Sequence, residues 1–317
     1  MRRWPTWLLV GALGALGAIA TADALRGSTN EVSVEAPRRQ VASSPVLRLR
    51  EPNGVLYYSD ADDGCRLHGV GLPRLENAPP PQLQSCAFSL SPDGTAALAG
   101  NVSWSPRGGL YARESDRMIE LGSPASDERL RFPGRAPAFM LDGTFTYVTG
   151  RNEVVAWTTD CPPGARLFTL PADNATARCR LTLMRISEEP VLALAWLSSV
   201  RIAVITAPSE HVLTIREGKR ILLDSFGFGQ PLSDLRVSPR RHFVSVRAPG
   251  RGGLLVFHSD GSSASLPPLT DAHSIAWSPD DRWTAVATQN SVFLFRTDEP
   301  EPRVRRLAIT ARDLAWR

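Results

Sequence analysis

The stretch Ser274-Ile275-Ala276-Trp277-Ser278-Pro279-Asp280-Asp281 decides the fold, because related stretches recur along the chain. Ala87-Phe88-Ser89-Leu90-Ser91-Pro92-Asp93-Gly94 and Ser233-Asp234-Leu235-Arg236-Val237-Ser238-Pro239 share its form, a short apolar run followed by a turn. The chain ends in Arg312-Asp313-Leu314-Ala315-Trp316-Arg317, which is the apolar run without its turn. The segment that begins near Val46 lacks this run and starts with what should follow it. A repeat divided in this way predicts a ring that is closed by its last strand.

The spacing of the copies predicts the size of the repeating unit. A period near 40 residues with four short strands per unit is typical of a β-propeller blade. Two longer gaps are interpreted as insertions. Five complete units and one split unit predict an all-β, six-bladed β-propeller. The residues just before each turn, which define the alignment, are Leu90, Phe139, Trp196, Val237, Trp277 and Trp316.

The split unit is assigned strand by strand from a turn that recurs late in the chain. Asp62-Asp63-Gly64 matches Ser259-Asp260-Gly261, which follows the third strand of its unit. This match predicts residues 46–50 as the second strand, 55–59 as the third and 66–70 as the fourth. The C-terminal run then supplies the missing first strand and lies innermost. Closure of this kind removes the exposed sheet edges of an open stack.

The repeated turns carry a family resemblance. In Ser91-Pro92-Asp93-Gly94, Pro presets φ, Asp bonds the local backbone and Gly accepts positive φ, which suits a tight hairpin. With Trp277-Ser278-Pro279-Asp280 and Ser259-Asp260-Gly261-Ser262, these turns resemble the repeats of TolB-like, WD-repeat-like β-propellers over about residues 46–317. The resemblance implies a periplasmic or secreted binding platform. Some such propellers precede a hydrolase domain, and the chain is expected to lack one because it ends at the ring closure.

The N-terminus predicts export. Residues 1–3 form a basic n-region, and residues 4–24 contain an uncharged run that is interpreted as a membrane-anchoring helix or a signal segment. Basic residues before the span place the following domain outside the membrane. Residues 25–44 form a linker, and residues 45–317 form the propeller domain. We therefore expect a single-pass protein of a bacterial cell membrane, or a secreted or periplasmic protein if the segment is cleaved.

The four cysteines suit an exported protein. Cys65 and Cys86 are 21 positions apart, and Cys161 and Cys179 are 18 apart. Pairing within each couple is the simplest of the three connectivities, and an oxidising compartment permits it. The spacings do not fit a zinc site. We predict structural disulfides, with the connectivity left open.

The sequence contains no motif that identifies an enzyme. It has no Gly-x-Ser-x-Gly elbow, no calcium-loop pattern and no glycine-rich loop that opens a helix. The net charge is only +4, and arginines are scattered along the chain, so nucleic acid is not expected as a partner. No catalytic residue, cofactor or metal ligand is therefore assigned.

The predicted function is a non-enzymatic scaffold that binds a protein or cell-envelope partner. Function is expected on the face that carries the longer loops. Arg107, Arg151 and Arg251 are predicted to project there from three loops between second and third strands, as a basic rim for an acidic partner. The alternative is a small-molecule-binding or hydrolytic site in the central channel. Converging Asp, Glu, Asn or His side chains there would favour this alternative.

Overall fold

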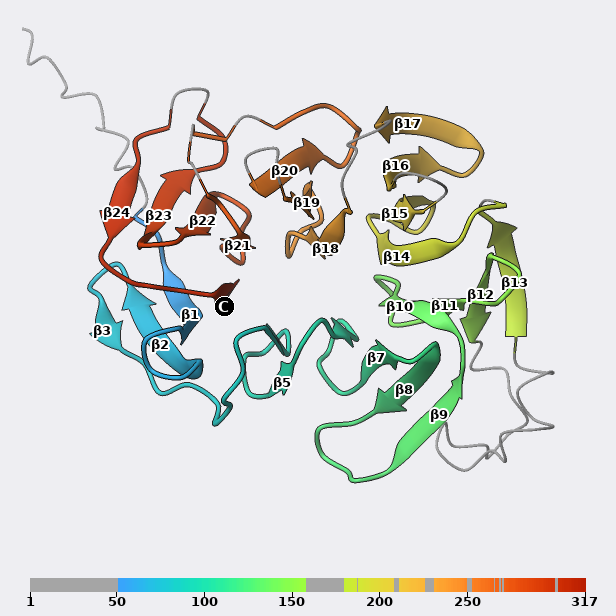
Figure 1. Cartoon of the computed structure of the whole chain (residues 1–317), viewed down its shortest axis with the longest axis horizontal. Helices are drawn as coiled ribbons and strands as arrows, with labels where there is room; N and C mark the ends of the chain where they lie inside the picture. The colour runs from blue at the N-terminus through green and yellow to red at the C-terminus, as the bar shows by residue number, and fades with distance from the viewer. Residues whose placement is uncertain are drawn as a thin grey trace, which may run out of the picture. The chain divides into compact units, whose positions relative to one another are not determined.

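The computed structural model describes residues 51–317 except 158–179, 187, 208–210, 226–230, 250–252, 265, 268, 270 and 300–301. These residues belong to the unit Arg50–Arg317. The predicted N-terminal helix and linker lie outside them. The described part is all-β, and its antiparallel sheets follow one another around a common centre, as expected for a WD-repeat-like β-propeller (Figure 1).

Seven sheets are formed by the described residues. In six of them the chain runs from the innermost strand outwards, whereas in the first the innermost strand, β25, comes from the end of the chain. The first comprises β25 (Asp313–Trp316), β1 (Gly54–Asp60), β2 (Arg66–Leu72) and β3 (Glu76–Asn77). The second comprises β4 (Phe88–Leu90) and β5 (Ala97–Ala99), and the third β6 (Ser103–Trp104), β7 (Tyr111–Ser115), β8 (Met118–Gly122) and β9 (Arg129–Pro133). The fourth comprises β10 (Arg135–Phe139), β11 (Phe145–Val148), β12 (Glu153–Trp157) and β13 (Arg180–Arg185).

The remaining three sheets complete the ring. The fifth comprises β14 (Val191–Trp196), β15 (Arg201–Thr206), β16 (Val212–Glu217) and β17 (Arg220–Ser225). The sixth has three described strands, β18 (Ser233–Val237), β19 (Phe243–Ala248) and β20 (Gly253–His258). The seventh comprises β21 (Ser274–Trp277), β22 (Trp283–Thr288), β23 (Ser291–Arg296) and β24 (Arg305–Leu307).

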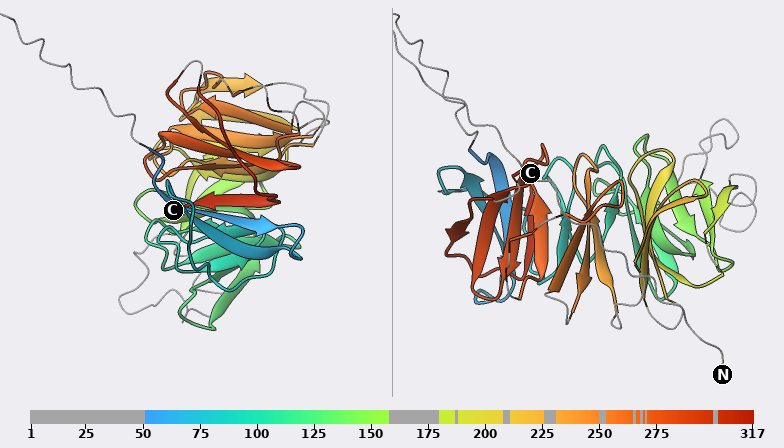
Figure 2. Two further views of the ribbon diagram at one scale, coloured as in Figure 1. Left: turned by 90° about the vertical axis from the view of Figure 1, so that its left-hand side faces the viewer. Right: turned by 90° about the horizontal axis from the view of Figure 1, so that it is seen from above.

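The C-terminal strand closes the ring as predicted, but with a different register. Strand β25 pairs antiparallel with β1, and the red C-terminal strand lies beside the blue β1 in Figure 2. In this pairing Leu56 is opposite Trp316 and Ser59 is opposite Asp313. The predicted third strand, 55–59, is therefore the second strand of its sheet, and the predicted fourth strand is the third. The predicted second strand, 46–50, lies outside the described residues. The Asp62-Asp63-Gly64 turn thus follows a second strand, so turn chemistry alone assigned it to the wrong position.

The predicted count of six blades is not confirmed, because the described chain forms seven sheets. The extra sheet arises from a turn that the repeat spacing concealed. Ser105-Pro106-Arg107-Gly108 adopts the same turn as Ser91-Pro92-Asp93-Gly94 only 14 positions later, which leaves room for two short strands between them. In both turns the serine hydroxyl accepts a hydrogen bond from the backbone amide five residues later. Ser91 Oγ accepts from Ala96 N at 2.9 Å, and Ser105 Oγ accepts from Leu110 N at 3.0 Å.

Apolar side chains hold neighbouring sheets together. Six buried clusters occur among the described residues, each between two adjacent sheets. The third and fourth sheets, for example, enclose Ile119, Phe132, Phe145 and Trp157. None of the six clusters joins the two-stranded β4–β5 sheet to the β6–β9 sheet. The tryptophans at the ends of first strands serve this packing: Trp196 and Trp316 are each 1% exposed.

Candidate functional site

The first strands of the sheets surround a central cavity of about 670 Å³. Residues of β4, β6, β10, β14, β18, β21 and β25 line it. A second hollow of about 810 Å³ adjoins it, and Asp234 and Arg236 line both. The second hollow is bordered by connections between sheets, such as Asp271–His273, and by turns between second and third strands, such as Gln289. It is the mouth of the channel on the face where the longer loops were expected.

Arg236 on β18 is the cation at the junction of the two hollows. Its guanidinium donates to the carboxylates of Asp234, at 2.9 Å, and Asp313, at 2.6 Å. It also donates to the carbonyl oxygens of Leu314, at 3.0 Å, and Ile275, at 3.3 Å. One side chain on β18 therefore binds the first strands of the two sheets that follow it around the ring.

Asp313 on β25 completes this network. Its side chain is 5% exposed. It accepts hydrogen bonds from Ser274 Oγ at 2.7 Å, from the amide of Leu314 at 2.9 Å and from the amide of Phe88 at 3.0 Å, besides that from Arg236. The carboxylate thus joins strands β18, β21, β25 and β4, which are distant in sequence and adjacent only in the closed ring.

The charges in the network stabilise one another. Burial alone lowers the pKa of Arg236, but the carboxylates of Asp313 and Asp234 outweigh that effect and hold the pKa above its usual range. At every physiological pH the guanidinium is therefore charged and paired. A buried ion pair is weak evidence for added stability, because the loss of hydration offsets the attraction between the charges. The network fits a structural role in ring closure.

The mouth adds further polar groups around this network. The ring of His273 lies between two backbone carbonyl oxygens, with Nε2 2.9 Å from that of Ala311 and Nδ1 3.2 Å from that of Asp271. Further polar residues of the lining are Asn101, Ser233, Arg247, Gln289 and Arg312. The mouth therefore combines both signs of charge. In the part of the chain that the structure describes, no group of three or more His, Cys, Asp or Glu side chains is arranged to hold a metal ion.

The opposite end of the channel is held together by the repeated turns. Asp281, 4% exposed, accepts Ser238 Oγ at 2.6 Å and so joins the turns of the sixth and seventh sheets. The terminal Arg317 donates to the carbonyls of Leu90 and Ser91, both at 2.8 Å. Burial lowers the pKa of Arg317 to about 10. These contacts bind the turns of the second, sixth and seventh sheets to neighbouring sheets.

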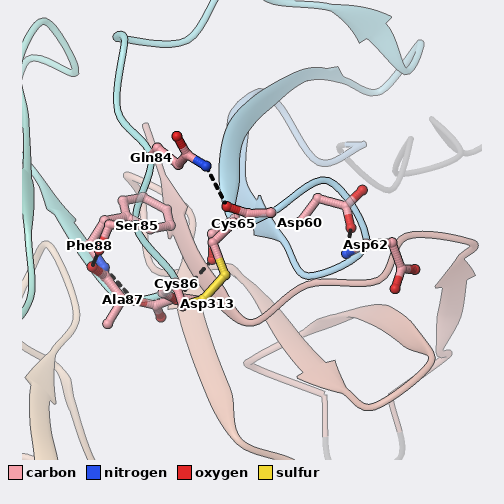
Figure 3. Close-up of a disulfide and its surroundings, with 11 residues drawn as sticks. Asp60, Asp62, Cys65, Gln84, Ser85, Cys86, Ala87, Phe88 and Asp313 are labelled. Carbon is pink, nitrogen blue, oxygen red and sulfur yellow. Dashed lines mark hydrogen bonds between the residues drawn. A yellow bond between two sulfur atoms is a disulfide. The ribbon is translucent and has the colours of Figure 1, made fainter.

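The disulfide Cys65–Cys86 is formed, as expected for one of the two couples (Figure 3). It joins the turn between β1 and β2 to the segment that leads into β4. Ser59, on strand β1, which pairs with β25, donates through its Oγ to the carbonyl oxygen of Cys86 at 2.9 Å. The disulfide thus fixes the segment that connects the first sheet, which contains β25, to the two-stranded β4–β5 sheet. Cys161 and Cys179 lie outside the described residues.

The predicted basic rim is not assembled as expected. Arg107 lies in the turn between β6 and β7, which joins a first strand to a second. Arg151 lies in the turn between β11 and β12, which joins a second strand to a third. These turns are at opposite ends of their sheets, so the two arginines lie on opposite faces of the ring. Arg251 is outside the described residues. The missed Ser105 turn caused the misplacement of Arg107.

The Arg236–Asp313 network was missed by sequence reasoning, although a signal was present. Asp234 and Asp313 occupy equivalent positions in the aligned copies, at the start of the first strand, and Ser274 occupies the same position in its own copy. Polar residues at this position in three consecutive copies indicate a group of polar side chains at one end of the channel, whereas the other aligned copies carry alanine there. Which of them meet depends on the order of the sheets.

No protein-family model and no curated protein matches the chain. Among solved structures, the chain is similar to the β-propeller domain of Cps50 (Swd1) from Myceliophteria thermophila. The two chains are 14% identical over 82% of this chain and 87% of the other, with a TM-score of 0.43. Among the described residues, no helix has the length and apolar character needed to cross a bilayer.

Proposed function

We propose that this chain is a non-enzymatic β-propeller scaffold that binds a protein or cell-envelope partner. The observation that carries the proposal is the Arg236–Asp313 network. The ionised groups at the junction of channel and mouth are committed to contacts among four sheets, each at hydrogen-bonding distance. A rigid ring of this kind presents its surfaces in fixed positions, which suits recognition of a partner.

The proposal places the propeller at the outer face of a bacterial cell membrane, with residues 4–24 as its anchor. The Arg2-Arg3 pair before an uncharged run supports this orientation. The Cys65–Cys86 disulfide supports an oxidising compartment. A secreted or periplasmic domain, released by cleavage of the segment, is the alternative. Protease treatment of intact spheroplasts tests the orientation: the propeller should be degraded, and protection of the full chain would contradict it.

The partner is tested with the full chain extracted from membranes in mild detergent. Chemical cross-linking before extraction, followed by affinity capture, should recover one partner in a near-equal molar ratio. The matched control is a truncated chain of residues 1–44, which keeps the predicted anchor and linker but lacks the propeller. Recovery of the full chain alone, or of the same partner by the control, would contradict a scaffold role for the propeller.

The central cavity favours a second candidate, a small-molecule-binding or hydrolytic site, and so do Asp234, Asp313 and His273, which converge at the mouth of the channel. Its volume of about 670 Å³ is in the range of ligand pockets. Differential scanning fluorimetry with panels of sugars, amino acids and nucleotides tests it. A rise in melting temperature that disappears in Ala195→Phe, which adds bulk at a cavity-lining position, would favour this candidate. No rise with any compound would count against it.

A further inference from the structure

The β6–β9 sheet has one apolar face and one charged face. Residues of the apolar face, such as Ala112, Ile119 and Phe132, pack against the β10–β13 sheet. Successive side chains of a strand point to opposite faces. The opposite face therefore carries Arg113 on β7, Glu120 on β8 and Arg131 on β9, which lie side by side in the sheet register.

Three arginines surround the single carboxylate on this face. Arg113 reaches Glu120 Oε1 at 2.7 Å, and Arg131 donates to Oε2 at 2.8 and 3.1 Å. Arg129 lies 4.0 Å from Oε1, and its guanidinium is 5.3 Å from the centroid of the buried Tyr111 ring. Three positive charges and one negative charge leave this cluster with a net charge of +2. We call these four charged residues the arginine cluster.

The cluster exposes its positive members and covers its negative one. The side chain of Glu120 is 8% exposed, whereas those of Arg113 and Arg131 are 41% and 69% exposed. The carboxylate is thus already neutralised by the protein. The guanidinium groups retain donors that face solvent, because each presents more donors than Glu120 can accept. The face presents a positive surface on which further carboxylates can bind.

The neighbouring sheet does not cover Arg113 and Arg131, which stay exposed on this face although Tyr111 and Glu120 beside them are buried. Most of the other sheets have four strands, but the sheet beside this face has only β4 and β5. The contact between the two sheets is made near their turns, where Gly108 approaches Pro92 and Ser91. The two outer strands that would cover the arginine cluster in a regular blade are missing (Figure 1). This is also the junction that has no buried apolar cluster among the described residues.

The edge of β5 beside this face is open. Strand β5 pairs with β4 along one edge, and its other edge has no strand in the described sheet. Gly100 N bonds to Ala87 O at 2.8 Å and Ser91 N to Ala96 O at 2.9 Å. Because hydrogen-bonded and non-bonded pairs alternate in antiparallel pairing, the backbone groups of Ala97 and Ala99 point to the open edge. Such an edge accepts an added strand.

We infer that the open edge of β5 and the arginine cluster together form a docking site for an extended acidic segment of a partner protein. The inference rests on the proposed scaffold function and names the surface and the chemistry of its partner. A strand added to β5 forms main-chain hydrogen bonds with Ala97 and Ala99. Acidic side chains on the face of the added strand that is turned toward the β6–β9 sheet then reach Arg113 and Arg131. The one carboxylate of the cluster, Glu120, is already paired and does not compete with them.

The binding test uses the full chain and a fluorescein-labelled peptide of four Glu-Thr repeats, followed by fluorescence anisotropy. The peptide is extended, acidic and soluble, and a Lys-Thr peptide of equal length is the charge control. We expect saturable binding of the acidic peptide that weakens at least fivefold between 50 and 500 mM NaCl, since exposed charge pairs are screened. Equal binding of the Lys-Thr peptide, or no binding of the acidic one, would overturn the inference.

Variants separate the two parts of the site. The pair Arg113→Gln and Arg131→Gln should raise Kd at least tenfold, whereas Arg282→Gln, which removes a half-exposed arginine on another sheet, should change it less than twofold. Ala99→Pro removes one edge donor and should raise Kd at least threefold. Each variant is compared with the wild type by circular dichroism and melting temperature. Equal effects of the Arg282 and Arg113/Arg131 changes would refute the assignment.

The same variants distinguish this inference from the proposed function. If the Arg113→Gln, Arg131→Gln variant loses the peptide and the captured membrane partner together, the site is supported. If it loses the peptide but still captures the partner, the scaffold function stands and the docking site is wrong. If light scattering shows that the wild type forms a dimer that this variant abolishes, the occupant is a second copy and the inference of an acidic partner fails.

Discussion

The ring closure is tested most directly by the change Asp313→Asn. This substitution preserves the shape of a side chain that is 5% exposed but removes its charge and one acceptor. The carboxylate accepts hydrogen bonds from Arg236, Ser274 Oγ and the amides of Phe88 and Leu314. An asparagine offers one oxygen to these donors, and its NH₂ group faces another donor. Strand β25 therefore loses part of its attachment to three other sheets.

The expected magnitude follows from burial of the pair. Removing one partner of a buried ion pair costs about 3–5 kcal/mol, and we expect the lower end, about 3 kcal/mol, because Arg236 keeps Asp234 as a second partner. For a domain of this size, about 2–4 °C is lost per kcal/mol, so the melting temperature should fall by about 6–12 °C. The matched control is Asp234→Asn, whose side chain is 20% exposed and which leaves the Asp313 contacts intact. Its cost should stay near 1 kcal/mol.

The assay is urea unfolding followed by tryptophan fluorescence, with the free energy of unfolding obtained by linear extrapolation. The double change Arg236→Met with Asp313→Asn should cost less than the sum of the two single changes by at least about 1 kcal/mol, because the two groups are in contact. Equal losses for Asp313→Asn and Asp234→Asn, or strict additivity in the double variant, would refute the role given to Asp313 in joining the sheets.

Three further outcomes are expected. Cys65→Ser with Cys86→Ser should lower the free energy of unfolding by about 3 kcal/mol, the chain-entropy value for a loop of this length, and a non-reducing gel of the wild type should run faster than a reduced one; identical mobility would contradict the disulfide. Gly253→Ala should lower the melting temperature by several degrees, because φ of Gly253 is +88° and a methyl group there would overlap the carbonyl oxygen of Ala272, just before β21. In the control Gly109→Ala the added methyl group meets nothing within 4 Å, so the melting temperature should stay within a degree of the wild type. Although burial alone raises the pKa of Glu120, hydrogen bonds and charge from the neighbouring arginines hold this pKa below its ordinary value of 4.5. The folded state therefore gains stability that is present above pH 4.5 and is lost as the pH falls through the lowered pKa. Glu120→Gln should flatten the acid side of a profile of melting temperature against pH, and an unchanged profile would contradict the pairing.

The β-propeller architecture could be predicted from the sequence because turns and strand ends are specified by residues that are close together in the chain. Ser91-Pro92-Asp93-Gly94 and Ser278-Pro279-Asp280-Asp281 form the same turn: the hydroxyl of each serine accepts the amide five residues later, at 2.9 Å. The C-terminal copy at Asp313–Trp316 predicted the closing strand, which pairs with β1. These features depend on neighbours in the chain, so they can be identified without knowledge of the fold.

The blade count failed for a reason that is also physical. The Ser91 and Ser105 turns begin only 14 positions apart, which is too short for four strands, and a count based on a regular period passes over such a short unit. Turn chemistry recurs wherever two strands meet. It therefore marks hairpins, but it does not say whether a hairpin is followed by two more strands. That decision rests with the length of chain available before the next first strand.

The sequence by itself determined that this protein is a ring of small antiparallel sheets closed by its own C-terminus, because repeats and turns are local. Only the tertiary structure decided which charged residues act together. Arg236 and Asp313 are 77 positions apart and meet because their strands are neighbours at the centre of the ring. Arg113 and Arg131 face solvent because the preceding sheet, β4–β5, stops at two strands. Such contacts depend on the order and length of the sheets, which no local pattern specifies.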